Sequence, residues 1–377
     1  MMNDSNAAIL ARTVNAERLS DSDCLRLFQS ADLLSVGQAA HQVRMQRCDP
    51  NSVTYNADRN INYTNVCTTR CSFCAFSRDE GDPDSYVLSE AEWREKIAEL
   101  YRSGGSQILL QGGLNPHLTL EYFEQLLRWL RAEWPHLHLH CFSPHEIDYM
   151  ASTADISIGE TLARLRVAGL QSVPGGGAEI LSDRPRHRLS PRKISADEWI
   201  KVMREVSRAG LRATATMMFG HRESMAERVE HLRRLRHLQD ETGVFTAFIA
   251  WTFQPKNARP KDKFCGSYEY LRTIAIARLY LDNIVNHQAS WVTQGPKVAQ
   301  ISLRMGINDL GSTMIEENVV REAGTSYRMN AADLESLASE AGFSPRKRDC
   351  FYGTYVHPGD APEGRGQTEI AFPSLRL

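Results

Sequence analysis

From about residue 60 to residue 305, short apolar runs alternate with longer segments in which apolar residues recur every three or four positions. A short run rich in β-branched and aromatic residues is typical of a strand, whereas the longer spacing is typical of a helix with one apolar face. Strands are predicted over 61–66, 107–111, 136–142, 170–173, 213–219, 245–251 and 289–293. Helices are predicted between them over 90–102, 120–133, 160–168, 196–209, 225–242, 268–286 and 297–305.

Residues that start and end helices stand at the expected places. Ser89 precedes the first of these helices, and Glu92 follows three positions later, which is the spacing of a capping box. Glycine follows four predicted helices, where a left-handed cap is favoured: Gly104, Gly169, Gly210 and Gly243.

The regular alternation of strand and helix predicts an α/β fold, with a parallel sheet covered by helices. Seven or eight such units suggest closure into a (β/α) barrel of the TIM type, and an open doubly wound sheet is the alternative. In either architecture, reactive side chains are expected at the carboxyl ends of the strands.

The chain is predicted to have four parts. Residues 1–58 are interpreted as an N-terminal helical extension, 59–306 as the barrel core, and 307–356 as the last strand with a C-terminal cap that contains a helix over 330–341. Residues 357–377 are rich in glycine, proline and charge, which predicts a flexible tail.

Composition excludes several classes of protein. The 377 residues include 44 Lys and Arg against 46 Asp and Glu, so a nucleic-acid binder or a polybasic membrane-surface protein is not expected. An apolar fraction of 42% is too high for a disordered chain. No apolar stretch approaches the ~20 residues of a membrane-spanning helix, and the N-terminus lacks the order of a secretory signal. A cytoplasmic location is therefore expected, where the 8 cysteines would be thiols or metal ligands.

Three of the cysteines form a motif. Cys67, Cys71 and Cys74 follow the first predicted strand with C-x3-C-x2-C spacing. Three thiolates on one loop can hold three irons of a four-iron cube and leave the fourth open to another ligand. A zinc site would require a fourth Cys or His, and none lies between positions 56 and 105. An electron carrier would normally ligate the fourth iron, and an accidental spacing is the remaining alternative.

The other five cysteines have no partner at ligand spacing and are interpreted as ordinary thiols. They are Cys24, Cys48, Cys141, Cys265 and Cys350.

The cysteine motif, with an aromatic residue before its last cysteine, resembles that of the radical S-adenosylmethionine (SAM) superfamily. The resemblance implies a 4Fe-4S cluster whose open iron binds SAM. It further implies that Phe73 packs near the adenine, and that Gly112 and Gly113 meet the methionine amino group through their carbonyls. The family's glycine pair usually ends in Glu, whereas this chain has Leu114.

Several longer sequence segments resemble the cyclic dehypoxanthine futalosine synthases of the futalosine route to menaquinone. They lie at 175–184, 215–221, 239–243, 288–295 and 311–318. Aminofutalosine synthases and the radical enzymes of deazaflavin assembly are the nearest alternatives. The implied small-molecule substrate is dehypoxanthine futalosine, and a low-potential electron donor such as flavodoxin or ferredoxin is the implied partner.

The resemblance also suggests roles for individual residues. Glu179 would bind the ribose hydroxyls of SAM, although a Glu favoured by a helix N-terminus is an alternative. His140 would point into the barrel among the cofactor-binding residues, or be a hydrogen-bonded core histidine. His221 would contact substrate or transfer a proton, or stabilise a turn. Arg184 would hold the benzoate of the substrate, unless it lies on a solvated face.

Glu316 and Glu317 follow the last predicted strand and could supply a base, and favourable placement at a helix N-terminus is an equal interpretation. In the implied reaction, a 5′-deoxyadenosyl radical takes the C4′ hydrogen of the substrate, and the resulting radical adds to the benzoate ring. A base then removes a ring proton while one electron leaves.

Overall fold

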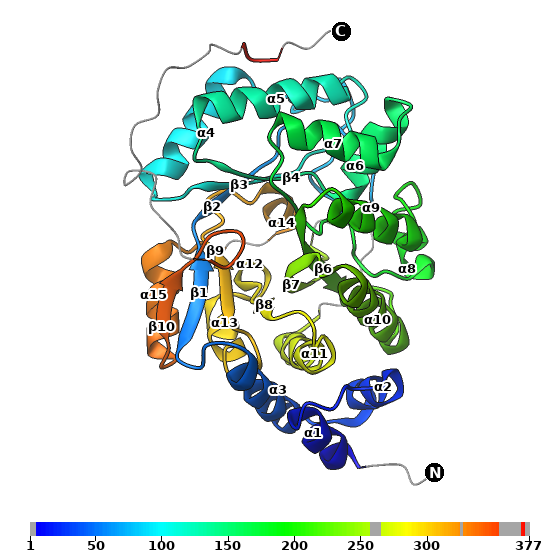
Figure 1. The fold of residues 1–377 in the computed structure, drawn as a ribbon, viewed down its shortest axis with the longest axis vertical. Coiled ribbons are helices and arrows are strands. Elements are labelled where there is room, and N and C mark those ends of the chain that lie inside the picture. Colours follow the sequence, from blue (N-terminus) through cyan, green and yellow to red (C-terminus); the bar gives the residue numbers. More distant parts are fainter. Residues whose placement is uncertain (1–4, 257–264, 325–326, 354–370, 374–377) are drawn as a thin grey trace.

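The structure is a computed structural model that describes residues 5–256, 265–324, 327–353 and 371–373 (Figure 1). The strands are β1 Ser52–Asn56, β2 Asp58–Ile61, β3 Gln107–Leu110, β4 His138–Cys141, β5 Ser172–Val173, β6 Arg212–Phe219, β7 Phe245–Thr252, β8 Asn286–Gln288, β9 Asp309–Ser312 and β10 Ser344–Lys347. The helices are α1 Asn6–Val14, α2 Asp21–Ser30, α3 Leu33–Arg47, α4 Glu90–Arg102, α5 Leu120–Glu133, α6 Pro144–Thr153, α7 Ile158–Ala168, α8 Asp183–Leu189, α9 Ala196–Arg208, α10 Met225–Thr242, α11 Ser267–Tyr280, α12 Trp291–Gln294, α13 Pro296–Ser302, α14 Asn318–Glu322 and α15 Ala331–Glu340. Within these ranges, no helix is both long and apolar enough to cross a membrane.

The strands form one ten-stranded sheet in the order β10-β1-β9-β8-β7-β6-β5-β4-β3-β2, and neighbouring strands are parallel. The sheet curls until its two sides meet at Asp58. On one side Asp58 stands opposite Gln107 of β3, and on the other its carbonyl accepts a hydrogen bond from the Ile315 amide at 3.3 Å. The fold is therefore a curled, TIM-like (β/α) half-barrel, which agrees with the predicted barrel class and not with a doubly wound sheet.

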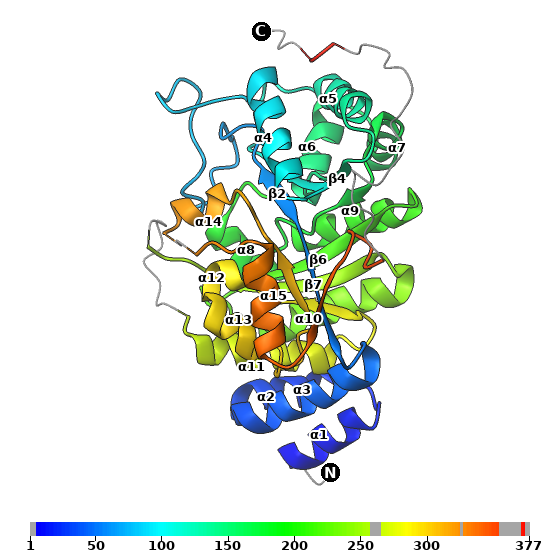
Figure 2. The same cartoon turned by 90° about the vertical axis from the view of Figure 1, so that its left-hand side faces the viewer.

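Helices cover the outside of the sheet in both views (Figures 1 and 2). Leu139 of β4 is fully buried and belongs to the same core cluster as Leu126 and Leu130 of α5. Each such side chain contributes about 1.5–3 kcal/mol through burial. The predicted helix caps are confirmed: Ser89 and Glu92 form a capping box, and the four predicted cap glycines have positive φ.

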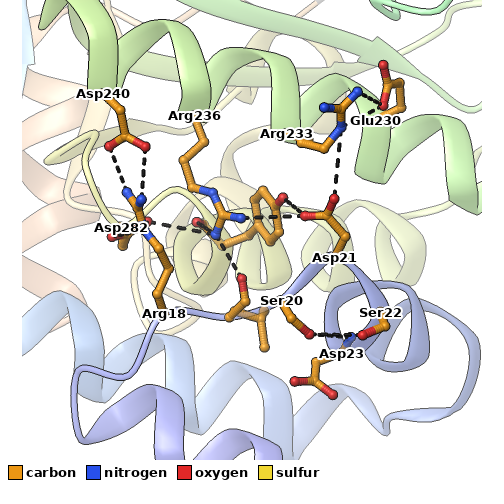
Figure 3. A network of polar contacts seen from close by, with 12 residues as sticks. Arg18, Ser20, Asp21, Ser22, Asp23, Glu230, Arg233, Arg236, Asp240 and Asp282 are labelled. Atoms are coloured by element: carbon orange, nitrogen blue, oxygen red, sulfur yellow. Dashed lines mark hydrogen bonds and ion pairs between the residues drawn. The ribbon is translucent and has the colours of Figure 1, made fainter.

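Helices α2 and α3 pack against α10 and α11 on the outside of the barrel, and α1 packs on α2 and α3 (Figures 2 and 3). Arg18 forms ion pairs with Asp240 in α10 and with Asp282 just after α11. Its Nη2 lies 2.7 Å from Asp240 Oδ1, and its Nε lies 2.9 Å from Asp282 Oδ2. Arg236 of α10 is buried and donates to the Leu19 carbonyl at 2.8 Å. These contacts attach the N-terminal helices firmly to the barrel.

Several predicted elements differ from the structure. Residues 52–56, expected in the helical extension, form β1. Of the strand expected at 289–293, residues 291–293 belong instead to α12, and β8 ends before this range, at Gln288. That apolar run is buried on all sides, where periodicity does not distinguish a strand from a helix. Helix α11 ends at Tyr280 and not at position 286, and α6 and α8 were not predicted. Apart from 371–373, the expected tail lies outside the described residues.

Candidate functional site

A cavity of about 410 Å³ lies inside the barrel and is lined by side chains from nearly every strand. Along the first two strands and just after them, alternate residues face it: Asn56, Asp58, Asn60 and Asn62. The cavity continues to the loop after β2, so a single space joins the polar interior of the barrel to the cysteine motif.

All three motif cysteines line this cavity. The loop that carries them is fixed by backbone hydrogen bonds from the Cys67 amide to the Arg78 carbonyl and from the Cys74 amide to the Cys71 carbonyl, both 3.1 Å. The Ser72 amide donates to the Leu189 carbonyl at 2.9 Å, which attaches the loop to α8. The loop is therefore ordered by the backbone, and its thiols are left available for ligation.

The thiols are suited to binding a cluster. Burial raises the pKa of Cys71, an effect that the nearby Lys193 opposes, and burial raises the pKa of Cys74 to about 11. Metal binding would deprotonate both thiols. No three His, Cys, Asp or Glu side chains in the described ranges converge closely enough to hold a single metal ion. A 4Fe-4S cluster requires thiolates that are spaced apart, because each thiolate binds a different iron.

Gly112 and Gly113 lie beside the cysteine loop and line the cavity. A Cβ atom on Gly112 would lie 2.6 Å from the Tyr63 ring, and one on Gly113 would lie 2.1 Å from the Val66 carbonyl oxygen. Glycine is therefore required at both positions for the β3 loop to pack directly against the segment that carries Cys67.

Two cavity residues that sequence reasoning missed come from the start of α6. Glu146 is buried, and its carboxylate accepts hydrogen bonds from Tyr63 Oη at 2.8 Å, the Gly112 amide at 3.0 Å and the amide and hydroxyl of Ser143. His145 Nε2 lies 2.9 Å from Thr69 Oγ1, and its Nδ1 has no partner. The capping-box spacing of Ser143 and Glu146 was the available signal.

Glu179 and Lys193 form a buried ion pair on the cavity wall. Lys193 Nζ lies 2.5 Å from Glu179 Oε1 and 5.4 Å from the centroid of the Phe73 ring. Burial alone would raise the pKa of Glu179, but Lys193 lowers it below its ordinary value. Glu179 is therefore a carboxylate near neutral pH, and Phe73 lies in the same part of the cavity.

His140 is buried and lines the cavity, with its Nδ1 2.7 Å from Ser172 Oγ. Burial lowers its pKa to about 3, so the imidazole is neutral. His140 therefore faces the cavity and is also hydrogen-bonded, and its place among the cofactor-binding residues stays a prediction.

Three predicted site residues are not brought to the cavity wall. His221 is fully buried behind it, with Nε2 3.1 Å from the Met218 carbonyl oxygen. Arg184 is half exposed and pairs with Glu227, its Nε 2.7 Å from Oε1. Glu316 accepts from Lys96 and Arg59, and although burial alone would raise its pKa, these bonds lower it. In this arrangement His221 and Arg184 do not reach a substrate in the cavity, and the Glu316 carboxylate is already paired and is not a free base.

Glu317, in contrast, does line the cavity, and Asn60 Nδ2 donates to its Oε2 at 2.7 Å.

The deep end of the cavity contains a polar group that the sequence did not predict. Arg348 donates to Asp309 through Nε at 2.5 Å and Nη2 at 2.8 Å, and its guanidinium lies 4.0 Å from the Tyr352 ring. Tyr352 Oη is buried without a partner, and Cys350 lines the same wall. These residues follow β10, far along the chain from β1, so local periodicity did not connect them with the barrel.

Two sequence families match the chain. Residues 61–235 match the radical SAM superfamily, and residues 242–360 match the CofH/MqnC C-terminal region.

Individual relatives cover nearly the whole chain. Cyclic dehypoxanthine futalosine synthase of Halalkalibacterium halodurans is 46% identical over 345 residues, which cover 91% of this chain and 93% of that protein. The enzyme of the same name from Streptomyces coelicolor is 40% identical, with 91% and 87% covered. A 5-amino-6-(D-ribitylamino)uracil–L-tyrosine 4-hydroxyphenyl transferase of Methanopyrus kandleri is 41% identical, with 85% and 89% covered.

Solved structures share the fold. Methylornithine synthase (PylB) superposes with a TM-score of 0.65 at 17% identity, covering 89% of this chain and 97% of that one. The FeFe-hydrogenase maturase HydG of Carboxydothermus hydrogenoformans superposes with a TM-score of 0.69 at 15% identity, covering 92% and 80%. Because the sequence likenesses extend over most of its length, the chain belongs to the radical SAM superfamily and carries the CofH/MqnC C-terminal region.

Proposed function

We propose that this radical SAM enzyme cyclises dehypoxanthine futalosine in the futalosine route to menaquinone. The observation that carries the proposal is that the cysteine loop and the polar barrel interior share one cavity. The 46% identity to a cyclic dehypoxanthine futalosine synthase over 91% of the chain supports the choice of substrate. A radical made at the loop would then form beside its substrate, in the same cavity.

Cys67, Cys71 and Cys74 would hold three irons of the 4Fe-4S cluster. When bound, the reduced cluster supplies the electron that cleaves SAM to methionine and a 5′-deoxyadenosyl radical. Gly112 and Gly113 stand beside the loop, where their carbonyls would meet the methionine amino group of SAM.

Glu179 would accept hydrogen bonds from the ribose hydroxyls of SAM. Lys193 engages Oε1 at 2.5 Å and keeps the carboxylate ionised, so that Oε2 and the remaining lone pairs are acceptors. Phe73 lies close enough to Lys193 to form the adenine side of the same pocket. His140 would donate or accept deeper in the cavity as a neutral imidazole.

The protein would also protect the radical from water. The apolar residues on the cavity wall include Met218, Ile249, Trp251 and Phe253. An apolar wall excludes water and positions the ring of the substrate, which is the main contribution a protein makes to an indiscriminate radical.

A second function is favoured by a specific observation, namely the 41% identity to the 4-hydroxyphenyl transferase of Methanopyrus kandleri. Under that alternative, 5-amino-6-(D-ribitylamino)uracil and tyrosine would be the substrates.

Two further proposals accompany the main one. The electron donor is a low-potential flavodoxin or ferredoxin, and the protein is located in the cytoplasm.

The test is a comparison of substrates. Anaerobically reconstituted protein with reductant and SAM would be incubated with dehypoxanthine futalosine or with 5-amino-6-(D-ribitylamino)uracil plus tyrosine. Mass spectrometry should find a cyclised product two hydrogens lighter than dehypoxanthine futalosine and no product from the second mixture. Product from the second mixture alone would overturn the proposal in favour of the transferase.

A further inference from the structure

Four carboxylates line the cavity among the described residues, and three of them are committed to other groups. Glu146 accepts four hydrogen bonds from the protein, Glu179 is paired with Lys193, and Glu317 accepts from Asn60. The fourth, Asp58, accepts one short hydrogen bond through Oδ1 and one long contact through Oδ2.

Asp58 is the first residue of β2 and lies deep in the barrel, six residues before Thr64 and the loop that leads to the cysteines. Its Oδ1 accepts a hydrogen bond from Ser312 Oγ at 2.5 Å. Its Oδ2 has only a long contact of 3.4 Å from Gln107 Nε2. One oxygen is therefore held in place while the other retains the capacity to accept a proton.

The surroundings of Asp58 make its carboxylate basic. The nearby cation, Arg348, is engaged by Asp309 through two hydrogen bonds, and Asp309, Glu317 and Cys350 are the other titratable groups around it. Burial, with a smaller effect from Glu317 and Asp309, raises the pKa of Asp58 to about 6 against the opposing effects of Ser312 and Arg348. A carboxyl with a pKa close to neutral is suited to accept a proton in catalysis.

We propose that Asp58 is the base that takes the proton lost by the substrate during cyclisation, an inference that rests on the proposed function. The substrate loses one hydrogen atom from C4′ to the 5′-deoxyadenosyl radical, and a new carbon–carbon bond forms to the ring. The ring C–H bond then breaks: its proton goes to Asp58 Oδ2, and one electron goes to a one-electron acceptor of the iron–sulfur class. The protonated Asp58 returns the proton to solvent when product leaves.

Other candidates for this step fit less well. Glu316, expected from the sequence to supply a base, is held by Lys96 and Arg59 away from the cavity wall. His140 has a pKa of about 3, which makes its imidazole a weak base.

The test compares Asp58→Asn with Asp148→Asn in the anaerobically reconstituted protein. Asp148 on α6 is a matched control, because burial also raises its pKa but it does not line the cavity. With dehypoxanthine futalosine, the Asp58→Asn protein should still form 5′-deoxyadenosine but make cyclised product at least ~10²-fold more slowly, which is the usual size of a general-base effect. The Asp148→Asn protein should resemble the parent.

The pH profile provides a readout that a merely structural role would not change. The parent rate of product formation should fall below about pH 6. Asp58→Asn should lose that dependence, and Asp58→Glu should keep it with most of the activity. A parent rate that is flat down to pH 5.5 would overturn the inference, even if Asp58→Asn failed to fold or to load iron.

Two further outcomes would also overturn it. One is an Asp58→Asn protein with the parent rate and profile, and the other is a raised KM with unchanged kcat, which would indicate that Asp58 only binds substrate. If the parent itself makes no cyclised product, the proposed function fails and this inference fails with it. If the parent makes product and Asp58→Asn matches it, only this inference fails.

Discussion

Lys193 Nζ lies 2.5 Å from Glu179 Oε1, and both side chains are almost completely buried beside the cysteine loop. Neither charge has bulk water to stabilise it, so each depends on the other. Lys193 is also close enough to Cys71 to oppose the rise in the pKa of that thiol. This pair therefore connects the predicted nucleoside site with the predicted cluster site.

Removing one member of the pair should be costly. Lys193→Met leaves the Glu179 carboxylate buried without its cation, so we expect a loss of about 3–5 kcal/mol in the free energy of unfolding and weaker SAM binding. Denaturant unfolding and calorimetry would measure the two effects. The matched control is Arg184→Met, which removes the cation of a half-exposed pair with Glu227 and should change little. Equal losses in the two variants would contradict this account of the buried pair.

Gly113→Ala should disturb the cysteine loop. Its Cβ would lie 2.1 Å from the Val66 carbonyl oxygen, so the backbone before Cys67 must move. We expect a loss of about 1–3 kcal/mol or more in the free energy of unfolding and a lower iron content after reconstitution. The matched control is Gly159→Ala in α7, where the new Cβ would lie 3.3 Å from an oxygen of the flexible Glu205 side chain. This variant should keep the free energy of unfolding and the iron content of the parent. Full iron loading in Gly113→Ala would show that the loop tolerates the shift.

Cys71→Ala should abolish formation of 5′-deoxyadenosine, because the cluster loses one of its three protein ligands. Iron analysis of the parent should give about four irons per chain and a brown protein, and the variant should hold fewer. Cys48→Ser, outside the cavity, is the matched control and should keep the parent iron content. A zinc-containing, colourless parent would reject the cluster altogether.

Stability should depend on pH through Asp58. Its pKa rises from 3.8 to about 6 on folding, so between these values the folded protein binds more protons than the unfolded chain. The free energy of unfolding should therefore fall by about 3 kcal/mol as pH rises from about 4 to above 6, at about 1.4 kcal/mol per pKa unit. Subtracting the profile of Asp58→Asn from that of the parent isolates this contribution. A difference that does not change with pH would mean that burial does not raise this pKa.

The barrel and the cysteine loop could be predicted because both depend on local signals. Alternating strands and helices specify the parallel sheet, and cluster ligation requires cysteines at close spacing on one loop. The first strand was harder to place. Its prediction began at residue 61, so Asp58 was assigned to the helical extension. The alternation of Asn56, Asp58, Asn60 and Asn62 was the signal for an inward-facing polar strand.

The rest of the site depends on contacts between distant parts of the chain. Arg348 and Tyr352 reach the cavity because β10 pairs with β1, almost 300 residues earlier. Arg184 and Lys193 lie nine positions apart in the sequence, yet only Lys193 faces the cavity. Spacing along the chain does not show which of two neighbouring cations meets a buried carboxylate, since that depends on how α8 and its following loop pack on the barrel.

The most direct test of the account follows a single hydrogen atom. Dehypoxanthine futalosine with deuterium at C4′ would be incubated with anaerobically reconstituted protein, SAM and reductant, and the nucleoside product would be analysed by mass spectrometry. The account predicts 5′-deoxyadenosine that carries one deuterium, together with a cyclised product that has lost it. Unlabelled 5′-deoxyadenosine formed alongside cyclised product would contradict it.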